Sequence, residues 1–200
     1  MAEPIKIEVF KLKTAGEITL ALSDPETKLD TGSGAALSAA VAASLLCRAA
    51  AMSDKENERV DYISRNAVIV RNYMIHLIDE DVKGRAPLKR ALKEGDERKI
   101  EAARHPAISI SSEIVNMMSQ TIEMAKELSA LCPKEAMHYL GECVEIALGA
   151  MKAARIYIVN MADQCSDDTF RFINRRENEI MIEKFSALAE EVFAAVEAAI

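Results

Sequence analysis

The chain has 200 residues, enough for one compact domain with a hydrophobic core of its own. Seven glycines and five prolines are few, and half of the residues are apolar, so long helices are favoured over the short strands of a sandwich or barrel. A net charge of −7 argues against a nucleic-acid partner, because phosphate binding depends on clustered cations.

The N-terminal segment has two parts with different patterns. Residues 1–13 alternate apolar and charged side chains, which indicates a weak strand or an extended arm. Thr14 and Glu17 have the spacing of a capping box, in which each side chain satisfies a free backbone amide of the other residue. They predict a short helix that runs through Leu22 and ends before Asp24-Pro25.

A polar loop leads to Gly32-Ser33-Gly34, at the start of an Ala-rich helix over residues 35–52. Free backbone amides at such a helix start could hold an anion. The small residues of this helix allow neighbouring helices to approach closely, which suggests a central place in a bundle. Its apolar run is interrupted by Arg48, so we interpret it as a buried helix and expect no membrane partner.

The next helix is expected from about Glu56 to Lys83, with Gly84 and Pro87 ending it. Its apolar residues recur at spacings of three and four, which defines one helical face. Four residues beyond the last of them the same face reaches Asp81, so a carboxylate occupies a position where the pattern requires a core residue. The apolar residues of this face are Val60, Ile63, Ala67, Val70, Met74 and Leu77.

Three further helices are predicted after a polar stretch over residues 89–104. The first begins at His105-Pro106 and runs to about Leu131, and the second begins with Pro133 in its first turn and runs to about Gln164. The last begins at Asp168. Five or six mostly long helices with short connections predict an all-α, up-and-down bundle, which we take as a single domain over residues 1–200.

The cysteines and the N-terminus indicate the compartment. The four cysteines form no CxxC pair and lie far from any histidine at ligand or nucleophile spacing, so we expect no thiol catalysis. The first residues, Met-Ala-Glu-Pro, lack the basic region and apolar core of a signal peptide. We therefore expect a cytoplasmic location. The cysteines are Cys47, Cys132, Cys143 and Cys165.

The acidic run Asp79-Glu80-Asp81 offers the best candidate for acid–base chemistry. At about 100° per residue the three carboxylates cannot share a face, so Asp81 points inward, Glu80 flanks it and Asp79 points away. A buried carboxylate without a partner has a raised pKa, which suits a proton-transfer group near neutral pH. The alternative is that the helix frays before Asp81 and the run is a solvated acidic end.

A metal site is not expected. Glu135-x-x-His138 has the spacing used by di-iron bundles, but such a site needs a second motif of this kind and two more inward glutamates. Both residues also fall in the first turn of their helix, where a solvated position is the simpler interpretation. A di-metal bundle would carry stoichiometric iron or manganese.

Three stretches in order resemble the formiminotransferase-cyclodeaminase, or methenyltetrahydrofolate cyclohydrolase, family of helical folate enzymes. Gly32-Ser33-Gly34-Ala35-Ala36-Leu37 is similar to that family's Gly-Gly-Gly-Ser-Ala-Ala-Ala-Leu, and Asp79-Glu80-Asp81 follows an apolar helix as in the family. The small-residue helix from Gly141 to Asn160 leads to Asp167-Asp168 and a last amphipathic helix. The resemblance covers about residues 14–195.

The resemblance implies a homodimeric bundle that binds a tetrahydrofolate one-carbon derivative and needs no cofactor beyond that carrier. The family's reactions are loss of ammonia from 5-formiminotetrahydrofolate to close the methenyl bridge, or hydrolysis of that bridge. A positioned carboxylate that moves one proton suffices for either reaction. On this hypothesis Asp81 transfers the proton, Glu80 assists, and Gly32, Ser33, Gly34 and Arg85 contribute to substrate binding.

Two departures from the family pattern bear on the activity. Leu29-Asp30-Thr31-Gly32-Ser33 stands where the family has Pro-Gly-Gly-Gly-Ser, which removes two glycines and adds a carboxylate. Arg85 stands where the family carries an aromatic residue. A catalytically inactive or ligand-shifted binding or assembly protein of the same fold therefore remains the alternative to a folate enzyme.

Overall fold

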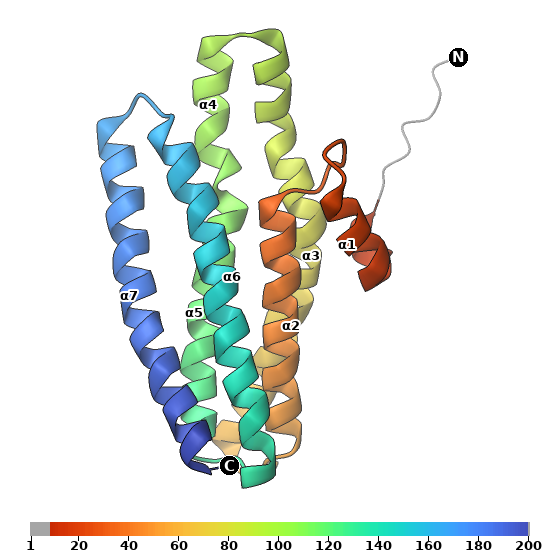
Figure 1. Ribbon diagram of the computed structural model, residues 1–200, viewed down its shortest axis with the longest axis vertical. Helices are drawn as coiled ribbons and strands as arrows, with labels where there is room; N and C mark the ends of the chain where they lie inside the picture. Colours follow the sequence, from red (N-terminus) through yellow and green to blue (C-terminus); the bar gives the residue numbers. More distant parts are fainter. Residues whose placement is uncertain (1–8, 200) are drawn as a thin grey trace.

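The structure, a computed structural model, describes residues 9–199. Within that range it has seven α-helices, two 3-10 helices and no strand, which confirms the all-α class. Its long helices run alternately up and down (Figure 1). The elements are η1 (Phe10–Leu12), α1 (Ala15–Ser23), α2 (Thr31–Ala51), α3 (Glu58–Glu94), α4 (Glu97–Ala107), α5 (Ser109–Ser129), η2 (Lys134–Ala136), α6 (Met137–Asp163) and α7 (Asp168–Ala199).

The two helices richest in small residues lie at the centre of the bundle. α2 packs against α3, α5 and α6, and α6 in turn packs against α5 and α7. Most of the buried positions of α2 are alanines, so its neighbours come close to its backbone, as the sequence predicts. By length and composition α2 could also cross a membrane, but half of its apolar window is buried inside the bundle.

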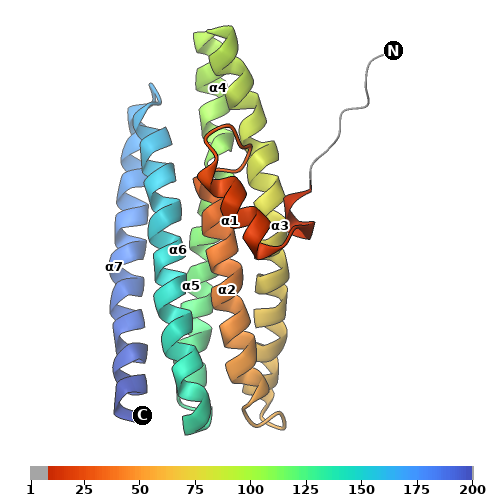
Figure 2. The same ribbon diagram turned by 45° about the vertical axis from the view of Figure 1, so that its right-hand side comes forward.

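The N-terminal elements match the sequence in part. Thr14 caps α1: its Oγ1 accepts from the Glu17 backbone N–H at 3.2 Å, and Glu17 Oε2 accepts from the Thr14 N–H at 2.7 Å. The predicted capping box is thus confirmed, and α1 lies across the upper part of α2 and α3 (Figure 2). Most of the predicted arm falls outside the described residues, and its last part forms η1 rather than a strand.

The predicted end of the third helix at Gly84 and Pro87 is wrong, because α3 continues through both residues to Glu94. Pro87 is exposed, so its ring lies on the solvent side. The helix ends at Gly95, whose φ of 68° lies in the left-handed region that glycine adopts without strain. The upper part of α3 and the antiparallel α4 therefore form a hairpin that projects beyond the rest of the bundle (Figure 1).

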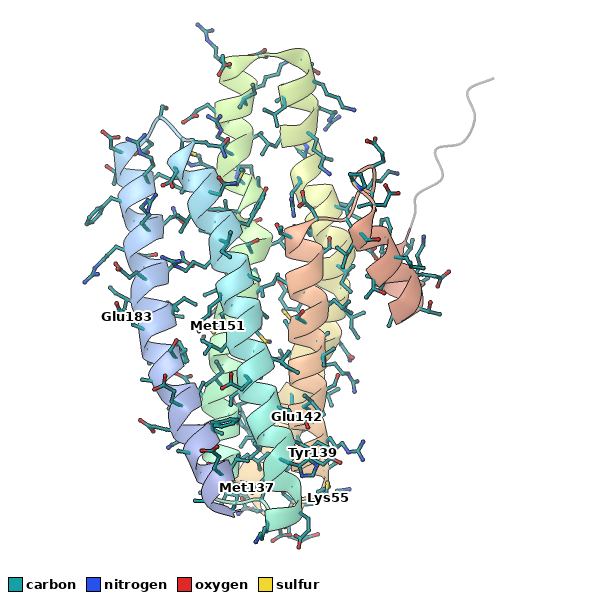
Figure 3. All side chains as sticks on the ribbon, viewed as in Figure 1. Lys55, Met137, Tyr139, Glu142, Met151 and Glu183 are labelled. Carbon is teal, nitrogen blue, oxygen red and sulfur yellow. The ribbon has the colours of Figure 1, made fainter. Side chains whose placement is uncertain are left out.

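The later boundaries also shift. The helix expected from His105-Pro106 is two helices, α4 and α5, separated at Ile108, and Pro106 lies in the last turn of α4. Pro133 precedes η2 instead of starting the long helix, whereas α7 begins at Asp168 as predicted. Figure 3 shows the resulting division of side chains, with the fully buried Met151 of α6 inside the bundle and Glu183 of α7 pointing away from it.

Candidate functional site

The apolar face of α3 continues into a buried carboxylate, as the sequence predicts. Asp81 is only 1% exposed, so the interpretation as a frayed, solvated helix end is wrong. It lies in the middle of α3 because the helix runs thirteen residues further, to Glu94. Its carboxylate points toward the first turn of α2, which packs along this part of α3.

Ser33 connects the Gly-rich motif to Asp81 although the two residues are 48 positions apart. Both the backbone N–H and the Oγ of Ser33 donate to Asp81 Oδ2, each at 2.9 Å. The amides in the first turn of a helix have no partner within the helix, and the helix dipole favours negative charge at that end. The carboxylate therefore satisfies a free amide of α2 and lies at the positive end of its dipole.

Gly32 makes this close approach possible. A Cβ added at position 32 would lie 2.1 Å from Asp81 Oδ1 and 2.7 Å from its Cγ. Those distances are far shorter than van der Waals contact, so any side chain here would displace the carboxylate. Because Asp81 is buried on all sides, it has little room to move.

Arg85, one helical turn beyond Asp81, is buried against the same carboxylate. Its Nε donates to Asp81 Oδ1 at 3.0 Å and its Nη2 to Oδ2 at 3.1 Å, a two-pronged ion pair. Its Nη1 pairs with Asp30, and its guanidinium lies 4.3 Å from the ring centre of Tyr157 on α6. Burial by itself lowers the pKa of Arg85, but the hydrogen bond and charge of Asp81 raise it above its ordinary value.

The prediction that Asp81 is buried is confirmed, but the prediction that its carboxylate has no partner is wrong. Asp81 accepts four hydrogen bonds, from Ser33 and Arg85. The two aspartates and one arginine of this group carry a net charge of −1. Asp30 is its outer member, since 42% of its side chain is exposed, and it also caps α2 by accepting from the Thr31 N–H at 2.8 Å.

A hollow of about 380 Å³ adjoins this group at the α1–α2 loop. Asp30, Thr31 and Gly34 line it from the start of α2, and Lys89 lines it from α3. A second, mostly apolar hollow of about 640 Å³ lies between α1, α2 and α6 and shares Leu22, Thr31 and Gly34 with the first. The first hollow is lined by Leu22, Asp24, Pro25, Thr27, Leu29, Asp30, Thr31, Gly34 and Lys89.

The remaining predicted site residues lie in three different environments. Gly34 lines both hollows, whereas Gly32 and Ser33 are buried behind them against Asp81. Arg85 lies in the same buried group. Glu80 does not join it: its carboxylate accepts from Lys83 Nζ at 2.7 Å and approaches His76 on the outer face of α3. The hydrogen bond from Lys83 lowers the pKa of Glu80.

Asp79 is a correction to the sequence analysis, which has it pointing away from the core. It is 7% exposed, and its Oδ1 accepts from the backbone N–H of Phe10 at 2.7 Å. The N-terminal η1 covers this side of α3, and the sequence carries no signal for that long-range contact.

Two more features were missed. The pairing of Asp30 with Arg85 could have been suspected, because both residues depart from the family pattern, but only the packing of α2 on α3 shows that they meet. Cys165 lies beside His105 and Glu101, contrary to the expectation that the cysteines are far from histidine. Glu135 lies in η2 and His138 in the first turn of α6, where the His138 ring packs on Tyr139.

Comparison with known proteins identifies the family. A family model described as formiminotransferase-cyclodeaminase matches residues 16–179, so the chain belongs to this family. The crystal structure of formiminotetrahydrofolate cyclodeaminase from Thermotoga maritima matches with a TM-score of 0.79 over 94% of this chain and 96% of that one. At 15% sequence identity this likeness shows the fold alone. A search of curated protein sequences finds no match.

Proposed function

We propose that this protein acts on a one-carbon unit carried by tetrahydrofolate, as a formiminotetrahydrofolate cyclodeaminase or a methenyltetrahydrofolate cyclohydrolase. The observation that supports this most directly is the contact between the two family motifs: Ser33 of the Gly-rich motif holds Asp81 of the acidic run, and Arg85 links Asp81 to Asp30, which lines a hollow. Family membership supports a folate-type ligand.

The charge of the site suits such a ligand. The reacting carbon lies in an amidinium group, which carries positive charge, and the group formed by Asp30, Arg85 and Asp81 has a net charge of −1. Fixed negative charge beside the hollow stabilises a cationic ligand and the positive charge that persists during ring closure. The apolar hollow beside Ile146 and Ile156 would take the flat pterin ring.

Each reaction needs a proton moved to or from an atom that is bonded to the reacting carbon. In cyclodeamination the N10 nitrogen attacks the formimino carbon and loses its proton, and ammonia leaves with one. In hydrolysis water adds to the methenyl carbon, one of its protons is released, the other passes to N5, and the bond from that carbon to N5 breaks. A carboxylate within hydrogen-bond reach can carry that proton.

Asp30 and Asp81 divide this task in the proposal. Asp30 is half-exposed and lines the hollow, so it touches the ligand and carries the proton. Asp81 is the residue that the sequence motif favours for this role, but it lies behind Ser33 and Arg85. In this arrangement it positions Arg85 and, through Arg85, the carboxylate of Asp30.

The test is turnover of 5-formiminotetrahydrofolate and of 5,10-methenyltetrahydrofolate, followed by absorbance of the methenyl form. We expect the wild-type protein to convert at least one of them, and Asp30→Asn to lower kcat about 100-fold or more, the usual worth of a proton-transfer group. Glu183→Gln is the matched control with unchanged turnover, because Glu183 is exposed on α7 and points away from the bundle. Absence of turnover of both compounds by wild type would overturn the proposal.

A second candidate function rests on the ion pair between Arg85 and Asp30. Both residues depart from the family pattern, and together they tie the loop to α3 where the family has flexible glycines. This favours a ligand-shifted or inactive binding or assembly protein of the same fold. It predicts that folates bind without turnover, or do not bind at all, which equilibrium titration monitored by ligand fluorescence distinguishes.

The proposal includes the homodimer that the family resemblance implies, with no cofactor beyond the folate carrier. It also includes the cytoplasmic location, and the absence of a membrane or nucleic-acid partner, that the residue pattern and charge predict. Light scattering of the purified protein tests the dimer directly, since a single mass near that of one chain would contradict it.

A further inference from the structure

A second group of polar side chains, which shares no residue with the Asp81 site, contains three potential metal ligands. Glu101 and His105 are one turn apart on α4, and Cys165 is in the turn between α6 and α7. A carboxylate oxygen, an imidazole nitrogen and the Sγ of these residues lie within 4.8 Å of one another. We propose that these three side chains bind a zinc ion, although the sequence pattern predicts no metal site.

The geometry is close to that of a zinc site. With zinc–ligand bonds of about 2.0–2.3 Å, the ligand atoms of a tetrahedral site are about 3.6 Å apart. A contraction of at most about 1 Å per pair would therefore close the site around an ion. Cys165 is buried and both carboxylate oxygens of Glu101 are hydrogen-bonded, whereas His105 is exposed, so the His105 side chain makes most of that movement.

The donor set points to zinc. Thiolate, imidazole and carboxylate together suit Zn²⁺, whereas Mg²⁺ and Ca²⁺ take oxygen ligands. A thiolate and a carboxylate supply two negative charges, which balance the ion. On binding, the Cys165 S–H bond is replaced by a bond from sulfur to zinc, and the proton passes to solvent without any redox change.

Neighbouring contacts hold the ligands in orientation. Glu101 Oε1 accepts from the N–H and the Oγ of Ser166 at 2.6 and 2.7 Å, and its Oε2 accepts from Arg104 at 2.9 Å. The hydrogen bonds from Ser166 lower the pKa of Glu101, which keeps it ionised. The His105 ring stacks on Phe170 at 3.9 Å. Such outer contacts are typical of metal ligands.

The position of the three ligands indicates how a metal ion enters the site and which elements it would join. A hollow of about 960 Å³ is lined by all three ligands, so a metal ion can enter and a water molecule can take the fourth position. Arg104 and Arg171 bring positive charge to this hollow, and both are paired, with Glu101 and Asp168. The bound ion would join the projecting hairpin of α3 and α4 to the turn between α6 and α7.

The test is zinc content and affinity in the full-length protein. After incubation with Zn²⁺ under reducing conditions and desalting, we expect about one zinc per chain by mass spectrometry. His105→Ala and Cys165→Ser should each weaken zinc affinity, measured by chelator competition, by more than about 100-fold, since even outer contacts are worth 10–100-fold. His138→Ala and Cys132→Ser are matched controls away from the group and should bind as wild type does.

Cobalt provides a spectroscopic readout that does not depend on activity. Bound Co²⁺ should give a thiolate charge-transfer band in the wild type that Cys165→Ser lacks. If the Cys165 variant fails to fold by circular dichroism, His105→Ala decides the matter, because His105 is exposed and its loss leaves the core intact. Zinc at background in wild type, or equal zinc affinity in wild type and His105→Ala, would overturn the proposal.

Discussion

At the head of α2, Arg85 lies between two aspartates and beneath the ring of Tyr157, with almost none of its side chain exposed. A buried charge is tolerated only when it is paired and hydrogen-bonded. Asp81 provides the pair, and Ser33 satisfies the carboxylate from its other side. Each member therefore depends on the others, and the group tolerates the loss of one member less than an exposed ion pair does.

Arg85→Met tests this dependence. The change leaves Asp81 buried without its counter-charge, so we expect the free energy of unfolding to fall by about 3–5 kcal/mol. Arg175→Met is the control: Arg175 pairs with Asp163 at the surface, and exposed pairs are worth about 1 kcal/mol or less. Urea denaturation measures both. Equal losses of unfolding free energy in the two variants would mean that burial does not make the Arg85 ion pair more important for stability than an exposed pair.

Gly32 and Gly34 should respond in opposite directions to the same substitution. Gly32→Ala places a Cβ 2.1 Å from Asp81 Oδ1, and we expect an overpacking cost of about 1–3 kcal/mol. Gly34→Ala meets only Leu22 methyl groups at 3.8 Å, so the helix gains about 0.5–1 kcal/mol from the better helix former. Thermal unfolding of the two variants measures whether their stabilities change in these opposite directions. A destabilised Gly34→Ala would contradict the open space around position 34.

At the scale of the helices, the apolar spacing of α3 predicts both its buried face and the burial of Asp81. The same sequence misplaces the helix end, because Gly84 and Pro87 are local signals and tertiary packing overrides them. Gly84 lies against α5, where an added Cβ would still find room 3.6 Å from Ile110, and Pro87 faces solvent. Neither residue disturbs the core side of the helix.

Pro87→Ala should therefore stabilise the protein. A proline inside a helix costs up to about 3 kcal/mol because it lacks an N–H and its ring crowds the preceding turn. Its exposed ring leaves no cavity when removed. Pro25→Ala, in the α1–α2 loop, is the contrasting control, expected to lose about 0.4–1 kcal/mol by freeing the unfolded chain. Calorimetry of both variants measures their melting temperatures. A Pro87→Ala variant that melts below wild type would contradict the prediction that Pro87 destabilises α3.

The candidate site was predictable only as far as its separate segments. Ser33 and Asp81 each carry a sequence signal, a helix start and a misfit in an apolar face. The meeting of Asp30 with Arg85 depends on how α2 and α3 align, and the contact of Phe10 with Asp79 depends on where η1 lies. No local pattern encodes either alignment, so the sequence alone predicts neither the partners of Asp81 nor the inward position of Asp79.

At the scale of the whole molecule, small residues bring α2 and α6 close together and leave Cys143 completely buried in the centre of the bundle. Burial raises the pKa of the Cys143 thiol to about 12, since the thiolate would lose its hydration there. Cys47 and Cys132 are half-buried, so the cysteines differ in access as well as in pKa. Cys143 thus reports on opening of the entire bundle.

Cys143 links stability to alkaline pH. Its folded pKa lies above the unfolded value of about 8.5, so the native state holds the proton more tightly. The stabilisation is complete below pH 8.5 and is lost as pH rises toward 12, and the free energy of unfolding should fall across that window. Cys143→Ala should show a shallower fall, by up to about 1.4 kcal/mol per pH unit, the contribution of one proton.

Val144→Ala is the control for this pH dependence, because it also removes buried apolar volume from α6 but leaves the thiol in place. It should unfold more easily than wild type at every pH and yet keep the wild-type slope above pH 8.5. Denaturant melts at four or five pH values measure both slopes. In native protein, peptide mapping after alkylation should show Cys143 modified after Cys47 and Cys132, at the rate of global unfolding. A Cys143 that reacts as fast as Cys132 would mean that the centre of the bundle opens without unfolding.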